Sequence, residues 1–159
     1  MKPVKLHLCS GDKHWPLFTN VDAHGEPDVV SDCKKLPFDS DYADEIHCIH
    51  GVEHFPRLAV DNMMVDWRRV LKPGGKLAIE VPCLNKIAQH IVNGEKNIRV
   101  TTLGIFGDPR DQKPAMLHQW CYTREELTQI LDQAGFSSIT VMEPVFHHKE
   151  RDMRVEAIK

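Results

Sequence analysis

Residues 44–81 read DEIHCIHGVEHFPRLAVDNMMVDWRRVLKPGGKLAIEV, and this stretch decides the fold. Residues 44–49 and 76–81 have the length and composition of short β-strands. Between them, apolar side chains recur at three- and four-residue spacings over residues 58–71, which predicts an amphipathic helix. The sequence KPGG at residues 72–75 ends that helix in a tight turn. A strand, a helix and a second strand in this order indicate a parallel βαβ unit.

Shorter elements extend the same alternation on both sides of this unit. Further strands are predicted at residues 4–9, 19–22, 28–31, 136–142 and 153–158. A second clear helix begins at Thr123, where Thr123 and Glu126 can form a capping box, and it ends at Gly135. The whole pattern predicts an α/β protein with a mostly parallel sheet and a hairpin as its last unit.

The composition fits one globular domain spanning residues 1–159, with 42% apolar and 27% charged residues. The 20 basic and 23 acidic side chains give a net charge of −3, which argues against nucleic acid as a partner. No apolar run approaches the roughly 20 residues of a membrane span, and no signal-peptide pattern is visible. The five cysteines include no CxxC pair, so neither a disulfide framework nor a zinc ribbon is expected. A reducing cytoplasm is the expected location.

Residues 84–121 are the least regular part of the chain. Residues 87–91 fit one short helix, but no sustained period follows Asn93 and Gly94. An irregular stretch of this length is usually a functional lid or a disordered insertion, and the sequence does not choose between them. We interpret residues 84–121 as a cap within the domain and expect residues 95–119 to close over a binding site.

Three polar or turn-forming positions follow the first strands. Gly11 comes after the first strand, Asp22 ends the second, and Asp32 follows the third. Ligands of open α/β sheets bind at the carboxyl ends of the strands, where carboxylates can accept hydrogen bonds from a ribose or an adenine amine. The dinucleotide fingerprint G-x-G-x-x-G and the P-loop are both absent. Taken alone, the three residues are more readily explained as a turn and two solvated acids.

Further motifs follow this cluster in a fixed order. The set is 5–11 (KLHLCSG), 20–22 (NVD), 31–32 (SD), 36–38 (LPF), 44–46 (DEI), 53–55 (EHF), 67–75 (WRRVLKPGG) and 131–136 (LDQAGF). In this order the chain resembles the class I S-adenosylmethionine-dependent methyltransferases, specifically the small methyltransferase-domain group called type 11. The resemblance covers residues 4–158. It implies a Rossmann-like, doubly wound sheet of seven strands with an antiparallel last strand, and S-adenosylmethionine as the cofactor.

The resemblance also implies which residues bind the cofactor. They are Cys9, Ser10, Gly11, Asp22, Asp32, Cys33, Leu36 and His50. Asp22 would hold the ribose, Asp32 the adenine amine, and Leu36 would lie against the adenine. The loop that begins at Cys9 would receive the methionine end, and His50 would lie near the sulfonium. Cys9 stands where such loops usually carry glycine, and the short spacing to Asp22 requires a very short first helix.

A different motif is formed by His50, Glu53 and His54, which spell H-x-x-E-H, the inverted zinc-protease pattern. That chemistry needs both histidines on one face of a continuous helix. Gly51 here follows a strand directly, and Pro56 disfavours helical geometry in the residue before it. A loop at the strand end is the better interpretation, and no metal site is expected. Glu53 and His54 could equally serve only to tie this loop to the following helix.

Two segments outside these motifs carry aromatic or histidine side chains. His118 resembles a histidine that related small methyltransferases place over the pocket, and both a contact with the acceptor and a packing role are open. Trp120 is expected to be a hydrophobic anchor, and Trp15 either a pocket wall or plain packing. The run HHKER at residues 147–151 is expected to be a solvated hairpin turn.

The sequence therefore predicts an S-adenosylmethionine-dependent methyltransferase with His50, His118 and Glu53 as its catalytic residues. Either histidine has an ordinary pKa suited to a general base, and Glu53 could orient one of them. The acceptor is expected to be a small molecule or a saccharide, without a membrane partner; the sequence does not reveal the oligomeric state. Two alternatives stay open: a catalytically inactive binding module with this fold and, more remotely, a zinc hydrolase.

Overall fold

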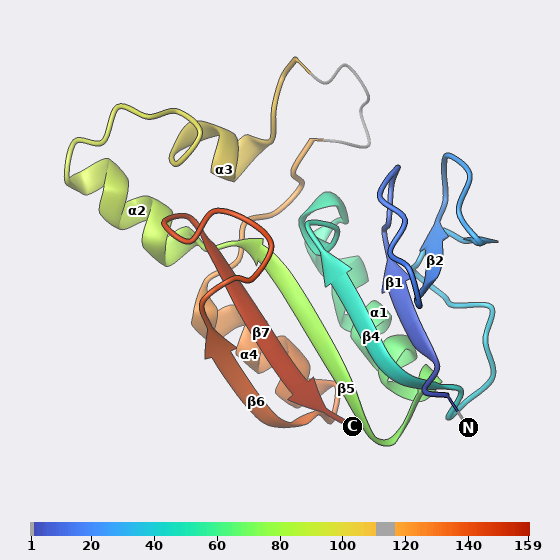
Figure 1. Cartoon of the computed structure of the whole chain (residues 1–159). Coiled ribbons are helices and arrows are strands. Elements are labelled where there is room, and N and C mark those ends of the chain that lie inside the picture. Colours follow the sequence, from blue (N-terminus) through green and yellow to red (C-terminus); the bar gives the residue numbers. More distant parts are fainter. Residues whose placement is uncertain (1, 111–116) are drawn as a thin grey trace.

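The computed structural model describes residues 2–110 and 117–159, and its strands form one seven-stranded sheet (Figure 1). The strands are β1 (Lys5–Leu8), β2 (Thr19–Asp22), β3 (Val29–Val30), β4 (Ala43–Ile49), β5 (Leu71–Pro82), β6 (Ser137–Met142) and β7 (Asp152–Ile158). Their spatial order is β3-β2-β1-β4-β5-β7-β6. Neighbours from β3 to β5 are parallel, and β7 is antiparallel to both β5 and β6. This confirms the mostly parallel seven-stranded sheet with an antiparallel last strand.

The predicted βαβ unit is formed by β4, α1 (Arg57–Val70) and β5. Ala43 pairs with Leu71, but the next pair along the strands is Glu45 with Lys76, so the KPGG turn at residues 72–75 bulges out of the ladder. This bulge lets the chain leave α1 and enter β5 without a separate loop.

Two helices, α1 and α4 (Arg124–Gln133), lie behind the sheet in Figure 1. Their buried side chains are Val60, Met63, Met64, Trp67 and Val70 of α1 and Leu127, Ile130 and Leu131 of α4. They form one core with alternate residues of the strands, such as Leu6 and Leu8 of β1. Because side chains alternate along a strand, the other face of the sheet receives the residues in between.

The start of α4 follows only half of the predicted capping box. Thr123 Oγ1 accepts the Glu126 N–H at 3.1 Å, as expected. The Glu126 carboxylate does not return to the cap; it accepts Arg57 Nε–H at 2.8 Å and Trp120 Nε1–H at 3.0 Å. Trp120, expected as a hydrophobic anchor, is therefore held by a hydrogen bond and remains 43% exposed.

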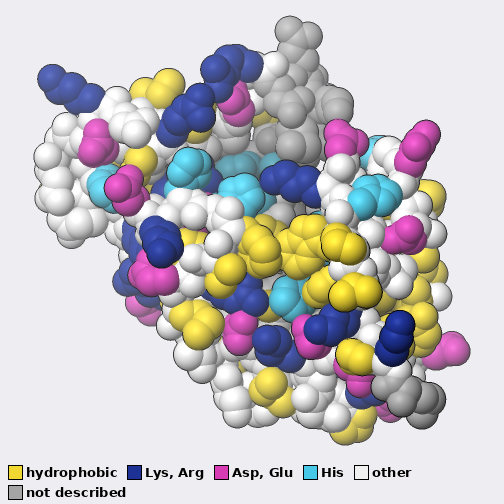
Figure 2. Space-filling model, in the orientation of Figure 1, with side chains coloured by type: hydrophobic (Ala, Val, Ile, Leu, Met, Phe, Trp, Pro, Cys, Tyr) yellow, Lys and Arg dark blue, Asp and Glu magenta, His cyan; other side chains and the backbone are white. Residues whose placement is uncertain are grey.

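The front face of the sheet, defined here as the face away from α1 and α4, carries ion pairs in place of helices among the described residues. The pairs are Lys5–Glu45, His47–Glu45, Lys76–Glu156, Arg154–Glu80 and Arg154–Glu156. Figure 2 shows this face, where charged and histidine side chains border a patch of hydrophobic ones. A doubly wound sheet has helices on both faces, but among the described residues this face has none. A strand face whose polar side chains are paired needs no helix to cover it.

Trp15 covers part of this front face. Its ring stacks on His7 with centroids 4.1 Å apart and lies 4.6 Å from the ring of Phe146. The backbone N–H of Trp15 donates a hydrogen bond to Asn20 Oδ1 at 2.9 Å. Residues 9–18 between β1 and β2 contain turns and no helix, so the expected very short first helix is not formed. A crossover between parallel strands usually takes a dozen or more residues and contains a helix, whereas residues 9–18 join the parallel strands β1 and β2 without one.

The predicted cap contains two helices, α2 (Leu84–Val92) and α3 (Thr102–Phe106), which lie beyond the carboxyl ends of the strands (Figure 1). The short helix expected at residues 87–91 is confirmed within α2, whereas α3 was not expected. A Cβ on Gly104 would approach Ile87 Cδ1 and Arg151 Cδ to 2.8 Å, so glycine permits this contact. Residues 111–116 of the cap lie outside the described residues. Among the described residues, no helix has the length and apolarity to cross a membrane.

Candidate active site

The strand order reverses between β1 and β4, which are parallel neighbours in the middle of the sheet. Ligands of open α/β sheets bind outside the carboxyl ends of the strands at such a switch point. The residues singled out from the sequence lie on both sides of it: the loop after β1 on one side, and His50, Glu53 and His54 after β4 on the other.

The loop after β1 is tied to the end of β2 by Asp22. Its Oδ2 accepts the Gly11 N–H at 2.8 Å, and its Oδ1 accepts the His24 N–H at 2.9 Å. Cys9 has a left-handed φ of 54°, a conformation that costs a residue with a Cβ roughly 1–2 kcal/mol. This explains why glycine would suit the position. Ser10 is buried, and its Oγ has no hydrogen-bond partner among the described residues.

Three thiols meet beside this loop. The thiols of Cys33 and Cys48 lie close to that of Cys9. A Cβ on Gly51 would lie 2.6 Å from Cys48 Sγ, so glycine is needed where the chain passes over them. The neighbouring Cys9 thiol and burial raise the pKa of Cys33 far above its ordinary value. Cys33 is therefore a neutral, packed thiol rather than a nucleophile.

The remaining predicted cofactor residues, Asp32 and Leu36, lie in different surroundings. Asp32 is exposed and accepts both the backbone N–H of Lys34 at 3.0 Å and its Nζ at 3.2 Å. Leu36 is 2% exposed within the hydrophobic core, and its N–H donates to Asp66 Oδ2 at 2.7 Å. A ligand would have to compete with Lys34 for Asp32, and Leu36 offers little accessible surface in this conformation.

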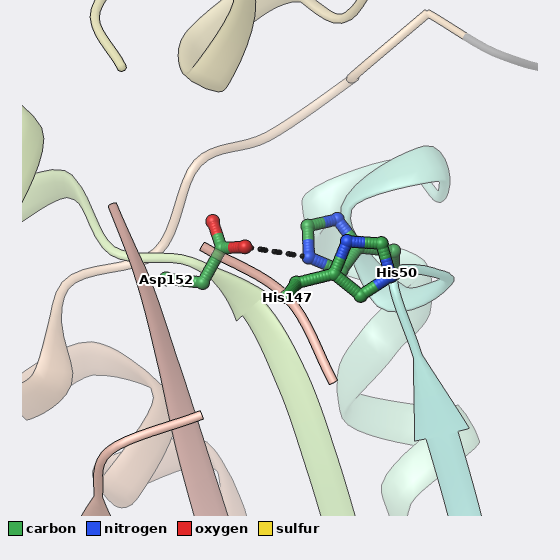
Figure 3. Close-up of side chains that lie close together, drawn as sticks. All are labelled: His50, His147 and Asp152. Atoms are coloured by element: carbon green, nitrogen blue, oxygen red, sulfur yellow. Dashed lines mark hydrogen bonds and ion pairs between the residues drawn. The ribbon is translucent and has the colours of Figure 1, made fainter. Parts of the chain in front are cut away.

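His50 lies between two carboxylates at the end of β4, and Figure 3 shows the one of Asp152. Its Nε2 is 2.9 Å from Asp152 Oδ2, and its Nδ1 is 3.0 Å from Glu53 Oε1. Burial alone would lower the pKa of His50, but the charge of Glu53 and the charge and hydrogen bond of Asp152 outweigh it and raise the pKa to about 9. At neutral pH the ring is an imidazolium without a free lone pair, which argues against His50 as the general base.

Asp152 and His147 complete this cluster, and the sequence analysis missed both. Burial alone would raise the pKa of Asp152, but hydrogen bonds from His50 and Arg151 hold it below its usual range. The His147 ring lies 4.0 Å from that of His50, and burial together with the His50 charge lowers its pKa to about 4. The expectation of a solvated turn is wrong for His147 and Arg151. The sequence feature that could have indicated Asp152 is an acidic residue at the start of an apolar strand.

A second cluster joins Glu53 and His54 to the segment before α4. Both belong to the 3₁₀ helix η1 (Val52–His54), and Glu53 is fully buried. The rings of His54 and His118 are 5.0 Å apart, edge to face. The N–H groups of Gln119 and Trp120 donate to the Glu53 carbonyl at 2.8 and 3.2 Å. Glu53 and His118, distant in sequence, thus lie together.

The H-x-x-E-H motif is divided between these two clusters. His50 belongs with Asp152, whereas His54 belongs with His118. The loop interpretation is confirmed, because η1 is a single 3₁₀ turn and does not continue the geometry of an α-helix. The two histidines therefore do not share the helix face that the zinc-protease arrangement requires.

Two open surface grooves lie away from the loop after β1. One, of about 540 Å³, runs along α4 beside β6, and the other, of about 740 Å³, runs along α2. Neither is lined by the residues after β1 and β4, so chemistry, rather than concavity, identifies the candidate site.

Comparisons with known proteins point to one family. A family model described as a methyltransferase domain matches residues 17–79. The chain is 39% identical over 51 residues to a sterol 4-C-methyltransferase of Caenorhabditis elegans, covering 32% of this chain and 15% of that protein. It is 40% identical over 53 residues to a ubiquinone/menaquinone biosynthesis C-methyltransferase of Bordetella avium, covering 33% and 20%. The matched segments are thus a minor part of both relatives.

Solved structures match the whole fold. A methyltransferase of Thermotoga maritima, described as a possible histamine N-methyltransferase, aligns with a TM-score of 0.69 at 14% identity, covering 100% of this chain and 83% of that one. A methyltransferase of Archaeoglobus fulgidus gives 0.68 at 15%, covering 99% and 86%. The motifs, the sheet order and the family model over residues 17–79 agree and support a class I S-adenosylmethionine-dependent methyltransferase, a family and fold that imply S-adenosylmethionine as the cofactor.

Proposed function

We propose that this chain transfers a methyl group from S-adenosylmethionine to a small-molecule or saccharide acceptor. The observation that carries the proposal is the hydrogen bond from Gly11 to Asp22, which gathers the ends of β1 and β2 next to the switch point. The names of the two sequence relatives support methyl transfer to a small molecule.

The residues of this loop fit the cofactor. Each oxygen of Asp22 accepts one backbone N–H, and a carboxylate has about four acceptor positions, so capacity remains for the two ribose hydroxyls. The buried Ser10 Oγ lacks a partner among the described residues and could bond a polar group of the methionine end. Asp32 would bind the adenine amine after releasing Lys34.

When bound, the cofactor supplies an electrophilic methyl group on its sulfonium, so the protein must mainly align the acceptor and exclude water. Burial lowers the pKa of His118, which is therefore neutral at pH 7. Its Nδ1 faces the Gly104 carbonyl at 3.1 Å, which leaves Nε2 with its lone pair. Of the two candidate histidines, we therefore assign the acceptor side to His118, while the imidazolium of His50 holds Glu53 and Asp152 in place.

The test is cofactor affinity by titration calorimetry. Losing hydrogen bonds to a charged carboxylate costs roughly 1.5–3 kcal/mol, so Asp22→Ala should weaken S-adenosylmethionine binding by about 10- to 100-fold. Asp12→Ala is the matched control, because Asp12 is an exposed acid of the same loop. Equal affinity in Asp22→Ala and the parent would remove Asp22 from the site, and no binding in the parent would contradict the proposal.

Product formation distinguishes an active methyltransferase from the alternative, a catalytically inactive binding module. The parent protein, incubated with S-adenosylmethionine and mixtures of hydroxyl- and amine-bearing metabolites, should release S-adenosylhomocysteine. Cofactor binding without any such product across the mixtures would favour the binding module.

A further inference from the structure

We infer that Glu53, His54 and His118 form a binding site for a divalent transition-metal ion. One ligand atom from each residue lies within 4.8 Å of the others. An ion with bonds of about 2.0–2.2 Å to nitrogen and oxygen can bridge such a set after small side-chain adjustments. The inference departs from the sequence-based expectation of no metal, and it does not depend on methyl transfer.

The first argument is the environment of Glu53. The side chain is fully buried, and neither carboxylate oxygen has a hydrogen bond of suitable geometry among the described residues. His50 Nδ1 lies 3.0 Å from Oε1, but this ion pair leaves Oε2 without a hydrogen-bond partner among residues 2–110 and 117–159. Buried carboxylates are normally paired or coordinate metals, so a second cation would complete the surroundings of Glu53.

The second argument is the orientation of the two histidines. His54 Nδ1 lies 3.3 Å from the Leu117 carbonyl, and His118 Nδ1 lies 3.1 Å from the Gly104 carbonyl. A carbonyl can only accept, so each Nδ1 carries the proton and each Nε2 keeps its lone pair. Metal-bound histidines generally donate their other ring N–H to a carbonyl or carboxylate in this way. Both imidazoles are thus held in the tautomer that binds a metal.

The third argument is that the main chain already joins the two segments that supply the ligands. Besides the two N–H groups that reach the Glu53 carbonyl, Gln119 Nε2 donates to the His54 carbonyl at 2.6 Å. His118 N–H donates to the Phe106 carbonyl at 3.2 Å. The ligands are therefore brought together by backbone contacts, which lowers the entropic cost of binding an ion.

The ligand set decides the class of ion. Two imidazoles and one carboxylate suit Zn²⁺, Fe²⁺ or Mn²⁺, whereas Mg²⁺ and Ca²⁺ prefer sites built from oxygen ligands. Three protein ligands leave coordination positions for water or for an oxygen atom of another molecule. If the proposed function holds, this ion would lie on the acceptor side, and His118 would act there through the ion.

His50, His147 and Asp152 satisfy the same spacing, but their atoms are already in use (Figure 3). Asp152 accepts hydrogen bonds from His50, from the Arg151 guanidinium and from the His148 N–H. Both ring nitrogens of His50 face carboxylates. An ion would have to displace these partners, so we assign the site to the Glu53 cluster.

The experiment titrates chelator-treated full-length protein with Co²⁺, followed by visible absorption, and with Zn²⁺, followed by melting temperature. We expect one saturable site per chain, visible bands typical of histidine-bound Co²⁺, and a higher melting temperature with Zn²⁺. His118→Ala should weaken metal binding by at least about 10–100-fold, because even the loss of a residue that only hydrogen-bonds to a metal ligand has an effect of that size. Glu53→Gln should act in the same direction.

Two histidine controls sharpen the test. His24→Ala removes an exposed histidine outside both clusters, and His147→Ala removes one from the other cluster; both should keep the parent affinity. The inference is overturned if the parent shows no saturable site, if His147→Ala loses the ion while His118→Ala retains it, or if all variants weaken equally. Cofactor affinity measured on the same samples keeps the two proposals separate, since either can fail while the other holds.

Discussion

The two faces of the sheet are shielded from water in different ways. The back face is apolar and is covered by α1 and α4, with Trp67 fully buried between α1 and the strands. The front face is polar, yet Glu80 is also fully buried and Arg154 is only 5% exposed. Apolar and polar side chains alternate along the same strands. The apolar side chains therefore form a core that helices must cover, whereas loops and ion pairs are enough to cover the polar face.

The front face depends on contacts that each satisfy a buried charge. Glu80 accepts Arg154 Nη1–H at 2.9 Å and the N–H groups of Val145 and Phe146 at 2.8 and 3.1 Å. The loop before β7 is held over the sheet by these bonds, and Phe146 then packs against Trp15. The helices α1 and α4 cover the back face by burying apolar surface, whereas the loop before β7 covers the front face through specific hydrogen bonds. The front face should therefore be the more sensitive to substitutions that remove a charge.

The largest effect is expected on the back face. Trp67→Ala should lower the free energy of unfolding by about 3–5 kcal/mol, because it empties a large volume in the core and removes the Nε1–H bond to the Cys33 carbonyl at 2.8 Å. Trp15→Ala, the matched change on the front face, should cost about 1 kcal/mol, since Trp15 is only half-buried. Urea unfolding followed by circular dichroism measures both. Equal losses would contradict the distinction between the faces.

The next effect tests the charges of the front face. Glu80→Ala should cost about 3 kcal/mol, because it leaves Arg154 buried with Glu156 as its remaining partner. Glu80→Leu combined with Arg154→Met should recover much of this loss, since replacing both charges by apolar groups removes the unpaired one. Thermal and urea unfolding of the single and double variants give the comparison. A double variant that is less stable than Glu80→Ala would show that the charges contribute more than their mutual pairing.

The smallest expected effect is a pH dependence confined to the front face. Burial lowers the pKa of His47 and of His7 below the ordinary value near 6.5. The unfolded chain therefore takes up protons there before the folded chain does, so this contribution to stability is complete above pH 6.5 and is lost as the pH falls below it. The free energy of unfolding should decrease more gently between pH 7 and 5 in His47→Gln than in the parent.

His24→Gln serves as the control for this measurement, because His24 is exposed. It should keep the parental slope. The raised pKa of His50 acts in the opposite sense in every variant, since its contribution is complete below pH 6.5 and is lost as the pH rises to about 9, so only the difference between slopes is informative. Identical slopes for His47→Gln and the parent would show that His47 does not titrate differently in the two states.

Features encoded by neighbouring residues were predictable from the sequence. The period of α1, the KPGG bulge and the Thr123 cap all depend on side chains within one or two turns of each other, and the strands before them follow from apolar runs. The helix α3 was not predictable, because its five residues carry no period and it is held by the contact of Gly104 with distant partners.

The composition of the candidate site was predictable only in part. Glu53 and His118 were singled out from separate motifs, but nothing local indicated that they would meet. The bond between His50 and Asp152 depends on the register of β7 against β5, in which Asp152 pairs with Pro82, and on His50 N–H reaching the Glu80 carbonyl. A shift of one residue would turn Asp152 to the other face, and such a register is a property of the assembled sheet.

The position of β7 also orders the assembly of the molecule. The strand β6 precedes β7 in the sequence, yet it joins the sheet only through β7. Until β7 pairs, β5 and β6 both present rows of unbonded N–H and C=O groups, which are templates for pairing with other chains. A proteolytic cut before Asp152 would leave both strands in that state together. A chain in which β7 has not yet paired is thus prone to aggregation, and a chaperone that shields the edge of β5 would act at that stage.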